Sequence, residues 1–399
     1  MPRIPAILAA ALILAGIFGA AVLVSDSSKL TQSLILGALF GVVLQRSRFC
    51  FLCHWRDFID NRDPRGFSAI LVALGVGTLG YLVLFNSWLP DPTGGRLPPD
   101  AHIGPVGPVL AAASFIFGVG MAISGSCVSG HLYRLGEGSP TAPFALIGIV
   151  LGFAIGFSTW NPLYVASISE GAVSWIPSAL GYHAWIAVQL TVVAFIGVAV
   201  ALLGRLAAND APADERPLRH ALRRIFVDRW PATVGGAAVG VIATVAYFTV
   251  QPLGVTSAIG GLARSLSQQA GMLPETLHGL DGFAGCRTTV ATLLTPNAVF
   301  VGALVAASFA SALVAAQFKP AWPTRAQILR GTFGGVLLGW GSMTAIGCTV
   351  GTLLSGTMAG AVSGWVFFAA SFAGVFATLK MMKFIWPAAP AIQTSPVRN

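Results

Sequence analysis

The sequence predicts an all-α polytopic membrane protein, because it combines long apolar runs with very little charge. Of the 399 residues, 55% are hydrophobic and 9% are charged, whereas charged residues make up about a quarter of an ordinary soluble domain. Glycine is abundant, with 47 residues, as is usual where transmembrane helices pack closely or break. The net charge of +9 comes from short segments between the apolar runs. We therefore expect it to orient the chain in a lipid bilayer and not to bind nucleic acid.

About ten apolar runs are candidate spans, within an expected range of eight to twelve. The run at residues 4–24 is too long for the core of a signal peptide, so we expect it to be retained as the first span. The other candidate spans lie at roughly 30–45, 67–86, 106–124, 141–159, 183–204, 231–250, 296–317, 331–346 and 361–380.

The placement of arginine predicts how the chain is oriented. Five arginines lie between residues 46 and 65, and six lie between residues 205 and 230. Both segments should face the cytoplasm, because short cytoplasmic loops are enriched in Lys and Arg. The segments at 87–105 and 161–182 hold one Arg between them and should face outward. With these assignments successive loops alternate sides, and both termini are expected in the cytoplasm.

A glycine-rich stretch with a single cysteine occurs twice, each time at the end of an apolar run. A shift of 221 positions aligns Cys127 with Cys348 and Gly130 with Gly351, and it also aligns Gly118 with Gly339 and Gly120 with Gly341. Glycine breaks at corresponding positions of two halves indicate interrupted helices around a midplane binding site. The alternative is that these glycines only allow close helix packing, with a small inert thiol beside them.

A second internal match supports two halves of opposite orientation. Residues 37–42 match residues 236–241 at an offset of 199. In the predicted topology the matched spans cross the membrane in opposite directions, as an inverted repeat requires. The predicted organisation is an extra N-terminal span (1–29), a first repeat half (30–204), a cytoplasmic linker (205–230), a second repeat half (231–380) and a C-terminal tail (381–399).

The residues near the predicted midplane limit the chemistry of the site. The apolar spans carry almost no Asp, Glu, Lys or Arg, which argues against a buried proton relay or a fixed intramembrane cation. No phosphate-binding loop of the Walker A type is present. Helix N-termini attract small anions, and a thiol is a soft, weak donor suited to sulfur. We therefore expect a small sulfur-containing anion to bind around Gly125, Ser126, Cys127, Gly347 and Cys348.

Cys50, Cys53 and His54 allow several interpretations. Their sequence motif matches a c-type haem attachment site. However, haem is attached on the outer side of the membrane, and this segment should face inward. Cys50 and Cys53 could form a redox pair, or they could bind zinc with His54 and His131. Otherwise Cys53 fills space and is dispensable. Cys286, which follows a glycine, is expected to be a buried free thiol.

Taken together, the motifs resemble the YeeE/YedE sulfur-transport family, which includes bacterial thiosulfate uptake proteins. The resemblance is carried by Arg48-Phe49-Cys50, by the Cys127 and Cys348 stretches, and by the glycines that precede each of these two stretches. It implies an hourglass of helices with inward-dipping, re-entrant Gly/Cys loops in the bacterial inner membrane. It also implies that Cys50, Cys127 and Cys348 line a central path and pass thiosulfate along by S–H to sulfur contacts.

We therefore expect a transporter for thiosulfate or a closely related sulfur anion, without enzymatic activity, bound metal or cofactor. Two alternatives use Cys50 and Cys53: a membrane thiol oxidoreductase, and a sulfur-relay protein. A relay would deliver sulfur to a cytoplasmic sulfurtransferase or sulfur-carrier protein as its partner.

Overall fold

The structure is a computed structural model and describes residues 4–23, 27–204, 227–280 and 295–385. It is almost entirely helical, which confirms the all-α class. The described long helices are α1 (Ile4–Leu23), α2 (Ser28–Ser47), α4 (Pro64–Trp88), α5 (Pro108–Ser124), α7 (Ala142–Leu163), α8 (Ile176–Leu203), α10 (Ala232–Thr249), α12 (Pro296–Val314), α13 (Arg325–Thr344) and α14 (Val362–Ile385).

Four shorter helical segments and one small β-ribbon complete the described fold. The short segments are α3 (Phe51–Asn61), α6 (Val128–Gly136), α11 (Thr256–Gln269) and the π-helical η3 (Thr349–Gly356), and a π-helical turn, η1 (Tyr164–Ile168), follows α7. Strand β1 (Pro105–Val106) pairs antiparallel with β2 (Ala172–Val173).

Eight described helical stretches are long and apolar enough to cross a membrane, and α13 with η3 makes a ninth. This count lies within the expected eight to twelve and just below the ten spans drawn from the sequence. The tenth expected span, at residues 4–24, corresponds to α1, an apolar helix of 20 residues.

Prolines and hydroxyls mark where several helices begin. Proline stands in the first turn of α4, α5, α7, α8 and α12, where its missing N–H costs nothing. Thr295 caps α12 by accepting from the Ala298 N–H. Thr324 and Gln327 form a reciprocal capping box at the start of α13. These caps explain why the helices begin close to the ends of the apolar runs.

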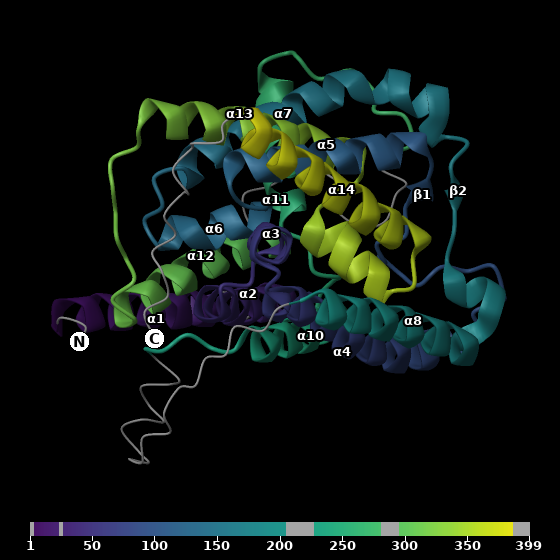
Figure 1. Ribbon diagram of the computed structural model, residues 1–399, viewed down its shortest axis with the longest axis horizontal. Coiled ribbons are helices and arrows are strands. Elements are labelled where there is room, and N and C mark those ends of the chain that lie inside the picture. The colour runs from purple at the N-terminus through teal and green to yellow at the C-terminus, as the bar shows by residue number, and fades with distance from the viewer. Residues whose placement is uncertain (1–3, 24–26, 205–226, 281–294, 386–399) are drawn as a thin grey trace.

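The long helices form two layers with the short helices between them (Figure 1). One layer contains α5, α7, α13 and α14, and the other contains α1, α2, α4, α8, α10 and α12. The short helix α3 contacts α4 in one layer and α14 in the other, while α6 and α11 each contact α7 and α12. The centre of the molecule is therefore built from short helices that a periodicity analysis of spans does not reveal.

The matched glycines of the two halves occupy equivalent helix contacts. Gly37 and Gly41 of α2 lie against the α12 backbone, and Gly236 and Gly240 of α10 lie against the α4 backbone. An added Cβ at Gly41 would overlap the carbonyl oxygen of Leu304. The matched glycines thus allow close helix packing at both helix pairs.

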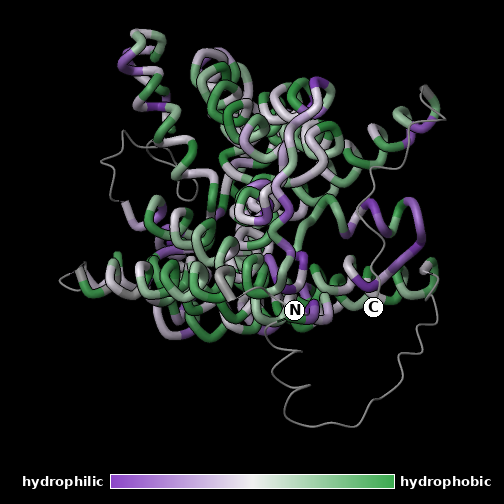
Figure 2. The backbone as a smooth tube through the Cα atoms, turned by 90° about the vertical axis from the view of Figure 1, so that its left-hand side faces the viewer, coloured by the Kyte–Doolittle hydropathy of each residue, from purple (hydrophilic) through white to green (hydrophobic). Residues whose placement is uncertain are grey.

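The outer helices repeat the correspondence between the α2–α12 pair and the α10–α4 pair. Helix α1 packs on α12, and α8 packs on α4. Helix α8 is only 11% buried along its apolar window, and Phe195 and Leu202 are 74% and 80% exposed. Figure 2 shows hydrophobic residues along most of the long helices and hydrophilic residues gathered in connecting stretches. An apolar exposed helix of this kind fits a lipid environment.

The predicted breaks in the helices are present. Helix α5 ends at Gly125 and α6 begins at Val128, while α13 and η3 meet at a bend of 43°. Helix α6 has nine residues and rises only about 13 Å, too little to cross the about 30 Å core on its own. The re-entrant form of these breaks stays a prediction, as does the division of the chain at residues 205–230, most of which lie outside the described residues.

Candidate functional site

The three cysteines Cys50, Cys127 and Cys348 occupy equivalent local positions. Each is the N-cap of a short central helix: Cys50 of α3, Cys127 of α6 and Cys348 of η3. All three are fully buried. Each thiol therefore lies beside the N–H groups and the partial positive charge of a helix N-terminus, where an anion is favoured.

The same backbone turn places each of these cysteines. The residue two positions earlier has a positive φ: 53° at Arg48, 88° at Gly125 and 54° at Ile346. Such a left-handed residue ends the preceding helix and redirects the chain. Glycine adopts this conformation at little cost, and the other two residues adopt it at a cost of about 1–2 kcal/mol. A left-handed residue two positions before the cysteine is thus common to all three segments.

The structure brings Cys50 and Cys127 into direct contact. Their Sγ atoms are 3.9 Å apart, and the Cys50 Sγ is 3.3 Å from the Ser126 Oγ. On the other side, the Cys127 Sγ is 3.4 Å from the Ser129 Oγ. Two thiols and two hydroxyls thus form one buried cluster, here called the thiol pair with its two serines.

Gly130 provides the space in which the thiol pair sits. A Cβ at this position would lie 3.0 Å from the Cys50 Sγ and 3.3 Å from the Cys127 Sγ, and it would overlap the Ser126 Oγ. No larger residue fits without displacing the cluster. In the sequence, Gly130 stands out only by its match to Gly351. The structure shows that a side chain here would collide with the thiol pair and the Ser126 hydroxyl.

His131 supports the turn before Cys127 instead of joining Cys50 and Cys53 in a zinc site. Its Nε2 is 3.1 Å from the Ser124 Oγ, and Ser124 also donates to the carbonyl oxygen of Ser126 at 3.2 Å. Among the described residues, no three His, Cys, Asp or Glu side chains gather as metal ligands. The zinc interpretation of His131 is therefore wrong.

Arg134 is a site residue that the sequence analysis missed. Its Nη2 donates to the Cys53 Sγ at 2.9 Å, and its Nη1 donates to the carbonyl oxygen of Gly125 at 3.2 Å. Arg134 lies on α6, outside the apolar spans named from the sequence. A signal existed, because Arg134 and Gly130 are four residues apart and so share a helix face. Cys53 is thus a hydrogen-bond acceptor for Arg134 and not only a space filler.

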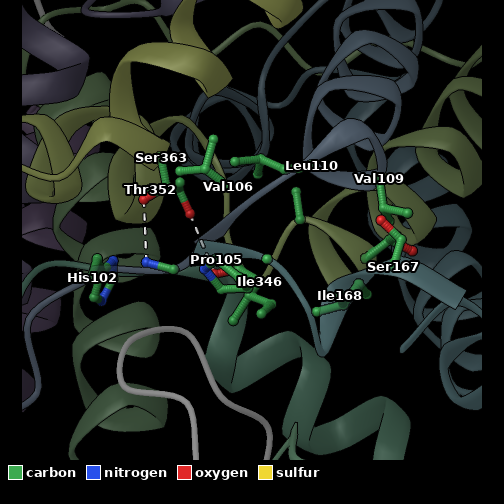
Figure 3. Close-up of a pocket in the computed structure, with 15 residues that line it drawn as sticks. His102, Pro105, Val106, Val109, Leu110, Ser167, Ile168, Ile346, Thr352 and Ser363 are labelled. Carbon is green, nitrogen blue, oxygen red and sulfur yellow. Dashed lines mark hydrogen bonds between the residues drawn. The ribbon is translucent and has the colours of Figure 1, made fainter. Parts of the chain in front are cut away.

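Cys348 lies at the second break, and residues on both sides of it in the chain line a small pocket (Figure 3). The pocket is lined by Thr344, Ile346 and Thr352 from the break, and by His102 and Ser363. The Thr352 Oγ1 donates to the carbonyl oxygen of Ile346 at 3.3 Å, and an added Cβ at Gly347 would overlap that hydroxyl.

Two side chains of this pocket have buried polar atoms without a hydrogen-bond partner, namely the His102 Nδ1 and the Thr344 Oγ1. His102 is 6% exposed, and burial lowers its pKa to about 4. The imidazole is therefore neutral at neutral pH. Cys348 lies at the start of η3, and Cys286 lies outside the described residues.

Comparisons with known proteins identify the family of this chain. Residues 46–377 match the family described as sulphur transport. The chain is 30% identical over 350 residues to the thiosulfate transporter TsuA of Spirochaeta thermophila, covering 84% of this chain and 93% of that one. It is 27% identical over 349 residues to the thiosulfate transporter TsuA of Escherichia coli, covering 85% and 90%.

A shorter match concerns the probable transporter YedE of Escherichia coli, which is 26% identical over 151 residues, or 38% of this chain and 35% of that one. The family match covers all three cysteine stretches and every long helix from α4 to α13. The chain belongs to the sulphur transport family of membrane proteins.

Proposed function

We propose that this protein carries thiosulfate, or a closely related small sulfur anion, across the bacterial inner membrane along a path lined by Cys50, Cys127 and Cys348. The observation that carries the proposal is the contact of the Cys50 and Cys127 thiols, 3.9 Å apart and fully buried between the two layers. The printed names of the two long relatives support the choice of anion.

The chemistry of the path follows from neutral donors that hold the anion weakly. A neutral S–H donates to the terminal sulfur of thiosulfate, while the serine hydroxyls and the N-terminal N–H groups of the short helices suit its oxygens. A site along a path must bind well enough to admit the ion and weakly enough to release it. Weak thiol donors meet both demands.

The test is growth on thiosulfate as the only sulfur source, in a strain that lacks other importers of thiosulfate and sulfate. Cys127→Ala and Cys348→Ala should each reduce thiosulfate-dependent growth and labelled uptake at least about tenfold, while growth on cystine stays normal. Membrane levels are checked by blot. If both variants grow like wild type at equal membrane levels, the thiol path is wrong.

The orientation is part of the proposal. We infer that both termini and the 205–230 linker face the cytoplasm, because the linker carries six arginines and such loops stay inside. Reporter fusions in this linker and at Asp100, which is exposed, should report opposite sides. The same side for both fusions would overturn the inverted arrangement.

A second candidate function, thiol redox or sulfur-relay chemistry, is favoured by one contact. Arg134 donates to the Cys53 Sγ at 2.9 Å, and a neighbouring guanidinium stabilises a thiolate, the reactive form of cysteine. A relay would hand sulfur to a cytoplasmic sulfurtransferase or carrier protein. Co-purification of such a protein, lost on Cys53→Ser, would favour this second function.

A further inference from the structure

Arg46 is a buried arginine, and only some of its hydrogen-bond donors have a partner. It lies near the end of α2 and is 2% exposed. One nitrogen, Nη2, donates to the carbonyl oxygen of Asp228, and the Arg46 carbonyl oxygen accepts from the Trp230 N–H at 3.0 Å. Its Nε and Nη1 are buried without a hydrogen-bond partner. An arginine that only orients the chain would lie in water, so burial with free donors requires another explanation.

Arg46 belongs to a group of like charges. Arg229 follows Asp228, and its Nη1 is also buried without a partner. Burial, together with the positive charges of Arg48 and Arg46, lowers the pKa of Arg229 to about 10. Arg48 is half-buried at the turn that leads to Cys50. The charges of Arg46 and Arg48, from the end of α2, therefore act on Arg229, which precedes α10 in a separate segment.

The negative charges nearby do not balance this group. Asp228 and Glu137 are the carboxylates that interact electrostatically with Arg46, and Glu137 also interacts with Arg229. Glu137 is in addition held by the Gln45 Nε2 at 3.2 Å. Among the described residues, three arginines thus face two carboxylates, and buried donors of Arg46 and Arg229 have no hydrogen-bond partner. A protein interior tolerates such an excess when an anion occupies it.

We propose that Arg46, Arg48 and Arg229 form an anion site that takes a doubly charged oxyanion, here thiosulfate leaving the thiol pair. This rests on the proposed transport function. The forked donors of guanidinium groups fit oxyanions geometrically. The site lies on the side where α2 ends and the arginine-rich linker joins α10, which makes it the exit on the orientation inferred above.

The test measures anion binding directly, on the purified full chain in detergent. Thermal unfolding is followed with increasing sodium thiosulfate against sodium chloride of equal ionic strength. Arg46→Gln and Arg229→Gln should each raise the half-stabilising thiosulfate concentration at least about tenfold, because a charge-assisted contact is lost. Arg46→Lys should restore most of the affinity. Arg325→Gln, at an exposed arginine, is the matched control and should match wild type.

The outcomes separate this site from the thiol path. Cys50→Ala should lose uptake yet keep stabilisation by thiosulfate, whereas loss of both would place the anion at the thiols and overturn the site. If Arg46→Gln fails to accumulate in the membrane, the test relies on Arg229→Gln, because Arg229 is only half-buried. Equal stabilisation of wild type and Arg229→Gln refutes the proposal. Stabilisation by phosphatidylglycerol or cardiolipin, with none by thiosulfate, would assign the arginines to a lipid headgroup and overturn it as well.

Discussion

Gly130→Ala tests the thiol pair without removing any of its donors. The new methyl group would lie 3.0 Å from the Cys50 Sγ and 3.3 Å from the Cys127 Sγ, and it would overlap the Ser126 Oγ. Ser126 must therefore change rotamer and give up its 3.3 Å contact with Cys50. Both sulfur atoms must also move by a few tenths of an ångström.

The expected stability loss is small and the transport loss is large. Inserting a methyl group into a packed interior costs about 1–3 kcal/mol, and replacing a helical glycine by alanine returns about 1 kcal/mol. The net loss of about 2 kcal/mol or less should leave the protein folded. Transport should fall at least about tenfold, because only about 1.4 kcal/mol of added barrier is needed for that and the methyl group fills the space between the donors.

The measurement is labelled thiosulfate uptake in cells with matched membrane levels, with thermal unfolding of the purified variant beside it. Gly75→Ala in α4 is the matched control, since its added Cβ would meet nothing within 4 Å, and it should transport normally. Wild-type uptake by Gly130→Ala would refute the view that the anion passes between these two thiols.

Three further predictions concern other parts of the molecule. Cys53→Ser keeps an acceptor for Arg134, so uptake should stay near wild type, whereas strong loss at normal membrane levels would favour thiol chemistry. Gly41→Ala should destabilise the protein by about 2 kcal/mol or more, because its Cβ would overlap the α12 backbone, while Gly302→Ala, with open space, should unfold at the wild-type temperature or above. His102 stays neutral in the fold, with its pKa lowered from 6.5 to about 4, so stability should fall as the pH drops from about 6.5 towards 4. His102→Gln should flatten that fall, which is at most about 3 kcal/mol, and an unchanged profile would contradict the assignment.

The long helices were predictable because a helix that crosses a bilayer needs a run of about 20 apolar residues, which is visible in the sequence. The ten described long helices from α1 to α14 each overlap an apolar run named from the sequence. The sequence alone does not give the roles of Gly37 and Gly236, since a break and a close helix crossing use the same residue. Only the position of a neighbouring backbone, such as that of Phe300 beside Gly37, distinguishes the two.

The central short helices were harder to predict for a physical reason. Helix α3 is amphipathic and 11 residues long, and it follows α2 across a turn at Arg48, so the sequence resembles an arginine-rich loop. Burial of Arg46 and the Arg134 contact to Cys53 depend on segments far apart in the chain. A count of charges in apolar runs misses both, because these arginines lie at the edges of the runs and the fold carries them inward.

The repeated turn before each thiol links the fold to the proposed transport. A cysteine aimed inward by its own side-chain packing could be displaced by any neighbouring change, but here the backbone sets the direction at Arg48, Gly125 and Ile346. Two of these residues are not glycine and carry a conformational cost of about 1–2 kcal/mol each. Strain of this kind persists only where the surrounding structure enforces it, and it concentrates at functional sites. The chain accepts that cost at two of the three breaks, and at all three the result is the same: a buried thiol at the N-terminus of a short central helix.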